Sequence, residues 1–258
     1  MAQGGRASVL RFVPQSDLTT VDPVTTTAYI TRHHALMVFD QLYRLDAQLK
    51  PQPQMVEGHT IEDAGKLWTF RLRDGLKFHD GEPVRGRDCI ASIRRWAQRD
   101  SLGQALMART DVMTTPDDRR FVIRLKRPYG LMLDTLAKLG PPALMIMPER
   151  LAMTDPAQQI PEVIGSGPFR FNPKERLVGA RVVYDRNPDY GPCADGALSW
   201  GRPRESCRCY RILAWSRSGQ GLPPDDASAH ASRRYRVQGI AACCCGLGST
   251  PCPCSTSS

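Results

Sequence analysis

The cysteines divide this chain into two parts of different composition. The sequence holds nine cysteines in 258 residues, and Cys89 is the only one that precedes Gly191. The segment 191–258 contains the others, is rich in Arg, Ser, Pro and Gly, and has no lysine. It shows neither sustained apolar alternation nor helical apolar spacing, the patterns that indicate strands and helices. We therefore expect a folded region in the first 190 residues and an aberrant, disordered tail after it.

The first part has the hydrophobic patterns of a mixed α/β fold. Trp68, Phe70 and Leu72 alternate with polar residues, and the segment 121–125 repeats this alternation, which is typical of strands with one buried face. Helical spacing begins at Ile30 and predicts an amphipathic helix that is entered from a threonine-rich loop. The sequence thus favours strands and helices that follow one another along the chain.

Two further helices and one further strand are expected. Asp88 can cap a helix, because a short acidic side chain can accept hydrogen bonds from the free N–H groups of a helix start. The run 131–139 favours another helix, and the apolar run 143–147 is expected to form a buried strand. In the helix near Asp88, one stripe of side chains is apolar: Cys89, Ile93 and Trp96.

Charge and hydropathy argue against two classes of partner. The net charge is +9, of which residues 1–190 carry +5 and the remainder +4. No basic block is interleaved with aromatic residues, so no nucleic-acid partner is expected. The longest apolar runs are far shorter than the roughly 20 residues that span a bilayer. Residues 1–8 lack the basic start and apolar stretch of a secretory signal, so none is visible here.

The sequence offers no recognisable catalytic or metal-binding motif. It contains no Gly-x-Ser-x-Gly elbow, phosphate loop or zinc-protease helix, so we expect no enzyme, no catalytic residue and no cofactor. His33 and His34 are adjacent, and side chains one residue apart on a helix point about 100° apart rather than toward one ion. These two histidines and His79 are expected to be solvated or to cap local structure, and Cys89 to be a small buried group.

Four segments, in order along the chain, form a recognisable set. The most specific segment, residues 65–84, reads GKLWTFRLRDGLKFHDGEPV, and the expected helix at 87–96 follows it. The third and fourth segments are GSGPF at 165–169 and NPDY at 187–190. Together these segments resemble the bacterial extracytoplasmic solute-binding proteins, a family that includes dipeptide, oligopeptide, nickel and glutathione receptors.

The resemblance implies an incomplete α/β fold of the type II periplasmic-binding-protein kind. Residues 8–45 would start the first lobe, 46–164 would form an extra lobe, and 165–190 would return to the first lobe. Full-length relatives are roughly twice as long as this chain, so the second ligand-holding lobe would be missing. The segment 191–258 would then lie outside the family's pattern.

The resemblance also implies a function: the substrate-binding component of an ABC-type importer for peptides or similar small solutes, present here as a partial fragment. The implied partners are a small-molecule or peptide ligand and the importer's membrane subunits, and the implied state is a periplasmic monomer. We place ligand contacts at Thr26, Thr27, Tyr29 and Arg32, where the family's cleft-lining loop should fall. Hydroxyls can fix polar groups and Arg32 can meet a carboxylate. The alternative is that these residues only begin and cap a helix.

The tail leaves two further hypotheses open. One is a cysteine-rich metal-binding or interaction module, although Cys-x-Cys pairs and three consecutive cysteines differ from the usual Cys-x2–4-Cys zinc spacing. The other is a shifted reading frame that begins between Tyr190 and Gly201. Read one base later, residues 204–210 can encode Val-Lys-Val-Val-Asp-Val-Thr, a strand-like segment that resembles the family's next strand. Sequencing of the gene tests this hypothesis.

Overall fold

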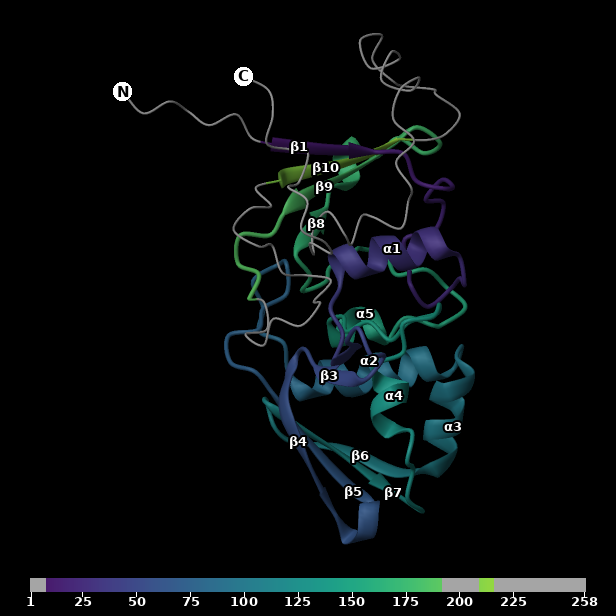
Figure 1. Ribbon diagram of the computed structural model, residues 1–258, viewed down its shortest axis with the longest axis vertical. Helices are drawn as coiled ribbons and strands as arrows, with labels where there is room; N and C mark the ends of the chain where they lie inside the picture. The colour runs from purple at the N-terminus through teal and green to yellow at the C-terminus, as the bar shows by residue number, and fades with distance from the viewer. Residues whose placement is uncertain (1–7, 192–208, 216–258) are drawn as a thin grey trace, which may run out of the picture.

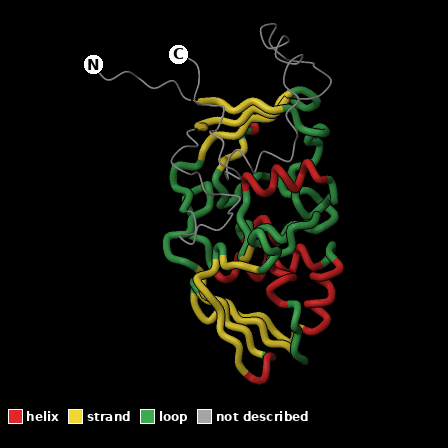
Figure 2. Tube along the Cα trace, in the orientation of Figure 1, coloured by secondary structure: helices red, strands yellow, loops and turns green. Residues whose placement is uncertain are grey.

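The structure is a computed structural model that describes residues 8–191 and 209–215 (Figure 1). Two four-stranded sheets lie at opposite ends of an elongated body, with helices between them (Figure 2). We call them the upper and lower sheets, after their places in Figure 1. The upper sheet has the order β1 (Ser8–Phe12), β10 (Cys209–Trp215), β9 (Arg181–Arg186) and β8 (Phe169–Phe171). The lower sheet has the order β4 (Val56–Glu62), β5 (Leu67–Leu72), β7 (Arg120–Leu125) and β6 (Thr110–Asp117).

The lower sheet confirms the predicted alternation. Every neighbouring pair in it is antiparallel. Trp68, Phe70 and Leu72 of β5 are buried, as are Phe121 and Ile123 of β7. The rings of Phe70 and Phe121 are stacked across the two strands, with centroids 4.8 Å apart. Apolar cross-strand pairs of this kind give a sheet its packed face.

Helices α2 (Gly86–Ala97) and α3 (Ser101–Arg109) lie between the lower sheet and the middle of the molecule (Figure 1). The predicted stripe on α2 is confirmed, because Cys89, Ile93 and Trp96 are fully buried. The helix begins at Gly86, before the expected cap. Asp88 acts from inside the first turn, where its Oδ2 accepts a hydrogen bond of 2.8 Å from the Arg85 N–H. The remaining short elements are β2 (Tyr43–Leu45), β3 (Pro51–Pro53), α4 (Met132–Leu136), α5 (Glu149–Ala152) and the 3-10 turns Asp63–Gly65 and Pro173–Glu175.

Helix α1 (Tyr29–Val38) lies beneath the upper sheet, and its range agrees with the helical spacing that begins at Ile30 (Figure 1). Its inner face contributes Ile30, Ala35 and Met37 to a hydrophobic cluster that also contains Phe169 and Tyr184 of the upper sheet. The cluster therefore joins α1 to strands that come more than a hundred residues later.

One strand lies where the sequence indicated no regular structure. Cys209–Trp215 forms β10, which pairs in parallel with β1 and antiparallel with β9. The expectation of a tail without structure is thus wrong for these seven residues. The segment contains Tyr, Ile, Leu and Trp, which favour strands, but it is short and surrounded by Cys, Arg and Ser. The present amino-acid sequence, without any shift of reading frame, therefore already provides a strand beside β1. The rest of the tail lies outside the described residues.

The middle of the molecule corrects two expectations. The run 143–147 is buried but joins no sheet, apart from a single bridge between Ile146 and Asp40. Side chains satisfy its backbone instead: Ser92 Oγ donates to the Met147 carbonyl, and Gln41 Nε2 donates to the Leu144 carbonyl. The helix expected at 131–139 is also shorter, since α4 ends at Leu136.

Candidate ligand-binding surface

Tyr29 and Arg32, two of the predicted ligand contacts, touch each other on α1. Residues three apart share a helix face, and the Arg32 guanidinium carbon lies 4.7 Å from the centre of the Tyr29 ring. This is a cation–π distance. Tyr29 is 54% exposed and Arg32 is half-buried. An aromatic and a cationic group are therefore adjacent and open to solvent at the start of α1.

The predicted threonines build the entry to the helix. Thr26 Oγ1 accepts a hydrogen bond of 3.2 Å from the N–H of Ala28, the residue before α1. Thr27 is exposed. In the described part of the chain, no hydrogen bond joins either threonine to Tyr29 or Arg32. The predicted set thus divides into a contacting pair and a neighbouring loop whose hydroxyls serve, at least at Thr26, a local structural role.

Arg32 also contacts His33. Its Nη2 donates to His33 Nε2 across 3.3 Å. Burial lowers the pKa of Arg32 from its ordinary value. Burial first, and the Arg32 charge second, lower the pKa of His33. His33 is therefore neutral near pH 7 and offers a lone pair to the guanidinium.

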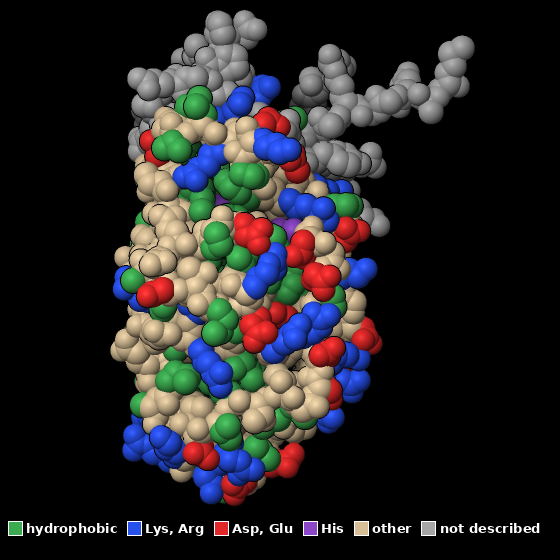
Figure 3. All heavy atoms as spheres, turned by 180° about the vertical axis from the view of Figure 1, so that it is seen from behind, with side chains coloured by type: hydrophobic (Ala, Val, Ile, Leu, Met, Phe, Trp, Pro, Cys, Tyr) green, Lys and Arg blue, Asp and Glu red, His purple; other side chains and the backbone are tan. Residues whose placement is uncertain are grey.

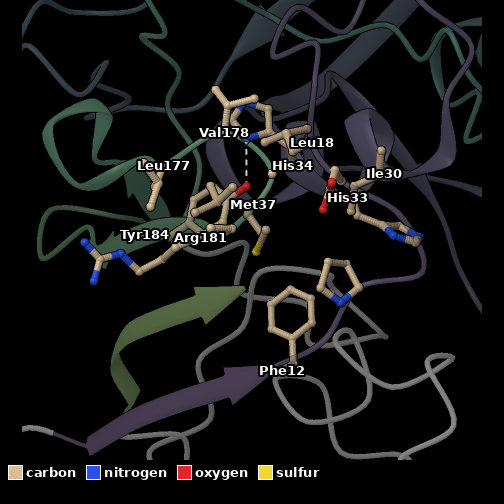
Figure 4. A pocket seen from close by; sticks show the side chains of 15 residues that line it. Phe12, Leu18, Ile30, His33, His34, Met37, Leu177, Val178, Arg181 and Tyr184 are labelled. Carbon is tan, nitrogen blue, oxygen red and sulfur yellow. Dashed lines mark hydrogen bonds between the residues drawn. The ribbon is translucent and has the colours of Figure 1, made fainter. Parts of the chain in front are cut away.

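A small pocket opens between α1, β9 and the end of β1 (Figure 4). Its volume is about 20 Å³, which is room for roughly one water molecule. Phe12, Ile30 and Met37 give it largely apolar walls, and His33 lines it as well. Within the pocket, His34 Nδ1 and the Tyr184 hydroxyl are joined by a hydrogen bond of 2.9 Å.

His34 corrects the expectation that both adjacent histidines are solvated or capping. It is 1% exposed, and burial lowers its pKa to about 3, so it is neutral. The signal was present in the sequence: Ile30 and Val38 lie four residues before and after His34, which places it on the apolar stripe of the helix. His33 lies outside that stripe, and its ring contacts the Arg32 guanidinium instead.

Three of the four segments that carry the sequence resemblance meet at the Gly167 carbonyl. His79 Nε2 donates to this oxygen across 3.0 Å, and Asn187 Nδ2 donates to it across 3.1 Å. His79 is therefore a structural donor rather than a solvated group, and burial lowers its pKa to about 4. A Cβ on Gly167 would lie 2.7 Å from the Val38 carbonyl carbon, so only glycine fits against the end of α1.

A buried ion pair links the loop after β1 to α2. Arg95 Nη1 and Nη2 donate to Asp22 Oδ1 and Oδ2 across 3.1 and 2.7 Å, and both side chains are at most 1% exposed. The Thr154 and Gln158 carbonyls accept further hydrogen bonds from Arg95. The charged atoms of Asp22 and Arg95 are all paired, so the contact fixes the loop after β1 against α2 without an unpaired buried charge.

A second polar group anchors the segment that leaves the upper sheet. Gln54 Nε2 and the Tyr190 hydroxyl both donate to Asp40 Oδ2, across 3.1 and 3.4 Å. Arg73 donates to the carbonyls of Gln54 and Gly191. Burial raises the pKa of Asp40. Residues far apart in the chain are thus fixed beside one another by these hydrogen bonds.

Neither a metal cluster nor a membrane span is found within residues 8–191 and 209–215. No group of three or more His, Cys, Asp or Glu side chains there could hold an ion. None of the helices in the described ranges is both long and apolar enough to cross a bilayer. Cys89 is a buried free thiol whose pKa is raised by burial. Most cysteines of the proposed metal module, such as Cys193 and Cys243–Cys245, lie outside the described residues.

The family model and the similar proteins that match this chain are both of the solute-binding kind. The model of the family described as "Bacterial extracellular solute-binding proteins, family 5 Middle" matches residues 50–198. The "Probable peptide ABC transporter periplasmic-binding protein y4tO" of Sinorhizobium fredii is 49% identical over 176 residues, which are 68% of this chain and 33% of the relative. The chain thus spans about a third of that relative's length.

Solved structures agree on the fold. NikA from Brucella suis, in complex with Fe(III)-EDTA, matches with a TM-score of 0.64 at 21% identity, over 81% of this chain and 39% of its own. The oligopeptide-binding protein AppA from Bacillus subtilis, in complex with a nonapeptide, matches with a TM-score of 0.63 at 18% identity, over 81% and 40%. The shared architecture therefore covers most of this chain and less than half of either relative.

Proposed function

Because the chain belongs to the bacterial extracellular solute-binding proteins of family 5, we propose that it is part of the substrate-binding component of an ABC-type importer for peptides or similar small solutes. Its fold is the type II periplasmic-binding-protein fold in incomplete form. The observation that carries the proposal is the 49% identity to a probable peptide-binding relative over 68% of this chain. Such identity extends over 176 residues, far more than a single motif.

The proposed ligand site lies at the start of α1 and uses Thr26, Thr27, Tyr29 and Arg32. Tyr29 offers an exposed aromatic face and Arg32 a guanidinium that can bind a carboxylate through two hydrogen bonds. In a two-lobed receptor, closure of the second lobe would bury the ligand against this surface. The described residues provide one wall only, so we propose that this chain acts as a partial fragment with weak binding.

The domain boundaries are part of the proposal: 8–45 and 165–190 for the first lobe, and 46–164 for the extra lobe. The hydrophobic clusters divide the chain slightly differently. Met145, Met147 and Leu151 pack with α1 in the upper cluster, although they fall inside the proposed extra lobe. The end of the extra lobe thus supports the first lobe from below.

The proposed partners are the membrane subunits of the importer, with the chain acting as a periplasmic monomer and without catalysis. We propose no nucleic-acid partner. On the face shown in Figure 3, Lys and Arg side chains are interspersed with Asp and Glu, without a broad patch of one sign. Mixed charge of this kind suits a soluble surface better than phosphate binding.

Native mass spectrometry of the whole chain with trialanine tests the function. We expect a one-to-one complex that is lost in Arg32→Leu and kept in Arg109→Leu. Arg109 is a matched control, since it lies over Tyr129 at 5.0 Å, far from the proposed site in the sequence. Equal complex formation by both variants would contradict the proposed site, and no complex with the unaltered chain would contradict peptide binding by this fragment.

The metal-binding alternative rests on the cysteines that follow residue 190. Its test is elemental analysis of reduced protein before and after deletion of 216–258, which leaves β10 in place. Stoichiometric zinc that disappears on deletion would favour the alternative over the receptor fragment. Sequencing of the gene checks the shifted frame: stop codons in the alternative frame downstream of residue 201 would exclude it.

A further inference from the structure

Two aromatic neighbours hold the guanidinium of Arg32. Tyr29 lies under it at 4.7 Å, and His33 Nε2 accepts a hydrogen bond from its Nη2 across 3.3 Å. The Nε–H of Arg32 is buried and has no partner within the described residues. A long arginine side chain loses much conformational freedom in such a contact. The guanidinium is therefore fixed before any ligand arrives.

The charge of Arg32 has no acidic partner. Among the described residues, no Asp or Glu lies within ion-pair distance of it, and Tyr29 is the one charged or titratable group that favours its charge. Other arginines differ: Arg95 faces Asp22, and Arg170 faces Asp189. A planar guanidinium without a carboxylate is complementary to a carboxylate supplied from outside.

We propose that His33 is a positioning residue that fixes Arg32 for the carboxylate of a bound ligand. The inference rests on the proposed function for its ligand. The contact between His33 and Arg32 is present in the chain without a ligand. His33 can accept from Arg32 only as a neutral imidazole with the Nε2 lone pair free. Its own proton then resides on Nδ1.

Acid should release the contact. A protonated His33 has a proton on Nε2 and a positive charge beside Arg32, so the hydrogen bond is lost and the two cations repel. The groups that line the same pocket are Asp17, Arg181, His34 and Tyr184. Burial and the Arg32 charge, the two causes that lower the pKa of His33, both oppose its protonation. Arg32 is therefore fixed at neutral pH and released as the pH falls below the ordinary histidine range.

The positioning role can be measured without a ligand. Proton NMR of the whole chain should show the Arg32 side chain shifted upfield by the Tyr29 ring. We expect this shift to be lost in His33→Leu, kept in His33→Gln, whose amide oxygen can accept the same hydrogen bond, and lost in the unaltered chain on acidification. Arg109 over Tyr129 is the internal control and should not respond. An unchanged Arg32 shift in a folded His33→Leu variant would overturn the proposal.

The carboxylate is tested with trialanine and trialanine amide at pH 7.5 and 5.5, where the peptide carboxylate stays ionised. We expect the acid to bind at least tenfold more tightly than the amide at pH 7.5. This preference should disappear in Arg32→Leu, weaken at pH 5.5, and become independent of pH in His33→Gln. Equal binding of both peptides would overturn the carboxylate assignment while leaving the proposed function intact. Binding of neither would count against the proposed function, and the NMR shift would still decide the role of His33.

Discussion

The two sheets of this molecule are assembled from very different parts of the chain. The lower sheet closes within residues 56–125, and all its neighbouring strands are antiparallel. The upper sheet places β1, which starts at Ser8, in parallel beside β10, which starts at Cys209. Contacts between distant residues carry a larger loop-closure entropy cost than local ones. We call each sheet with the hydrophobic cluster beside it a unit, upper or lower. The comparison teaches that the lower unit depends less on pairing between residues far apart in the chain.

The cores differ in the same direction. The lower cluster is built around stacked aromatic rings, including Phe70 and Phe121, and its buried Tyr129 hydroxyl is hydrogen-bonded to Thr135. The upper cluster borders a pocket that contains the buried pair His34 and Tyr184. Buried polar groups and unfilled space both reduce the gain from packing. We therefore expect the upper unit to open first.

The largest expected effect comes from Ile212→Pro. Proline has no N–H and disrupts a central strand, and Ile212 pairs with Leu10 of β1 and Tyr184 of β9. In hydrogen exchange followed by mass spectrometry, β1 and β9 should lose protection while β5 and β7 keep theirs. Ile212→Val is the control and should change neither. Equal loss of protection in both sheets would show that the halves are one cooperative unit.

The link between the halves should respond next. Arg95→Met leaves the Asp22 carboxylate buried without its partner, which typically costs about 3–5 kcal/mol of unfolding free energy. Urea unfolding followed by tryptophan fluorescence measures this loss. The double variant Asp22→Leu with Arg95→Met should recover part of it, because no unpaired charge remains. Should the double variant be as unstable as the single one, packing rather than charge dominates this contact.

Acid should destabilise the upper unit through His34. Its pKa is about 3 in the folded chain and about 6.5 when unfolded, so the unfolded state binds more protons below pH 6.5 and stability falls as the pH decreases toward 3. At pH 5 the expected loss is about 2 kcal/mol relative to pH 8. Unfolding measured at both pH values in the unaltered chain and in His34→Gln checks this, since glutamine does not titrate. An identical pH dependence in both would contradict the assignment.

The smallest effect is expected on the outer face of the lower sheet. Arg71 pairs with Glu57 at 3.1 Å, but both side chains are more than half exposed. Water and salt screen such pairs, so Arg71→Leu should change the free energy of unfolding by less than about 1 kcal/mol. Thermal unfolding at low and at moderate salt measures it. A larger loss would mean that this exposed face contributes to the stability of the lower unit.

Local patterns predicted α1 and two strands of the lower sheet, β5 and β7. The alternation at 68–72 and 121–125 and the spacing from Ile30 each lie within one element, so they can be read without knowledge of the rest of the fold. The short strand β10 could not be predicted in this way, because its partners are β1 and β9 and not its own neighbours. The run 143–147 was misassigned for a related reason: side chains of Ser92 and Gln41 supply the hydrogen bonds that a sheet would have supplied.

The assignment of ligand contacts stays a prediction. The residue types, and their place where the family's cleft-lining loop should fall, pointed to Tyr29 and Arg32, and the structure shows that these two side chains are in contact. The part played by His33 depends on the direction of one imidazole, which the sequence does not specify. Likewise, no spacing rule indicates that His79 and Asn187 donate to the same carbonyl of Gly167.

The parallel pairing of β1 with β10 also orders events during synthesis. The lower sheet is complete once Leu125 has left the ribosome, whereas β1 waits for Cys209. At about 5–20 residues per second, this interval is on the order of ten seconds. During it, β1 lacks its neighbour β10, and its unpaired backbone is open to any other extended chain. A factor that shields nascent strands would act on this segment before the rest of the molecule.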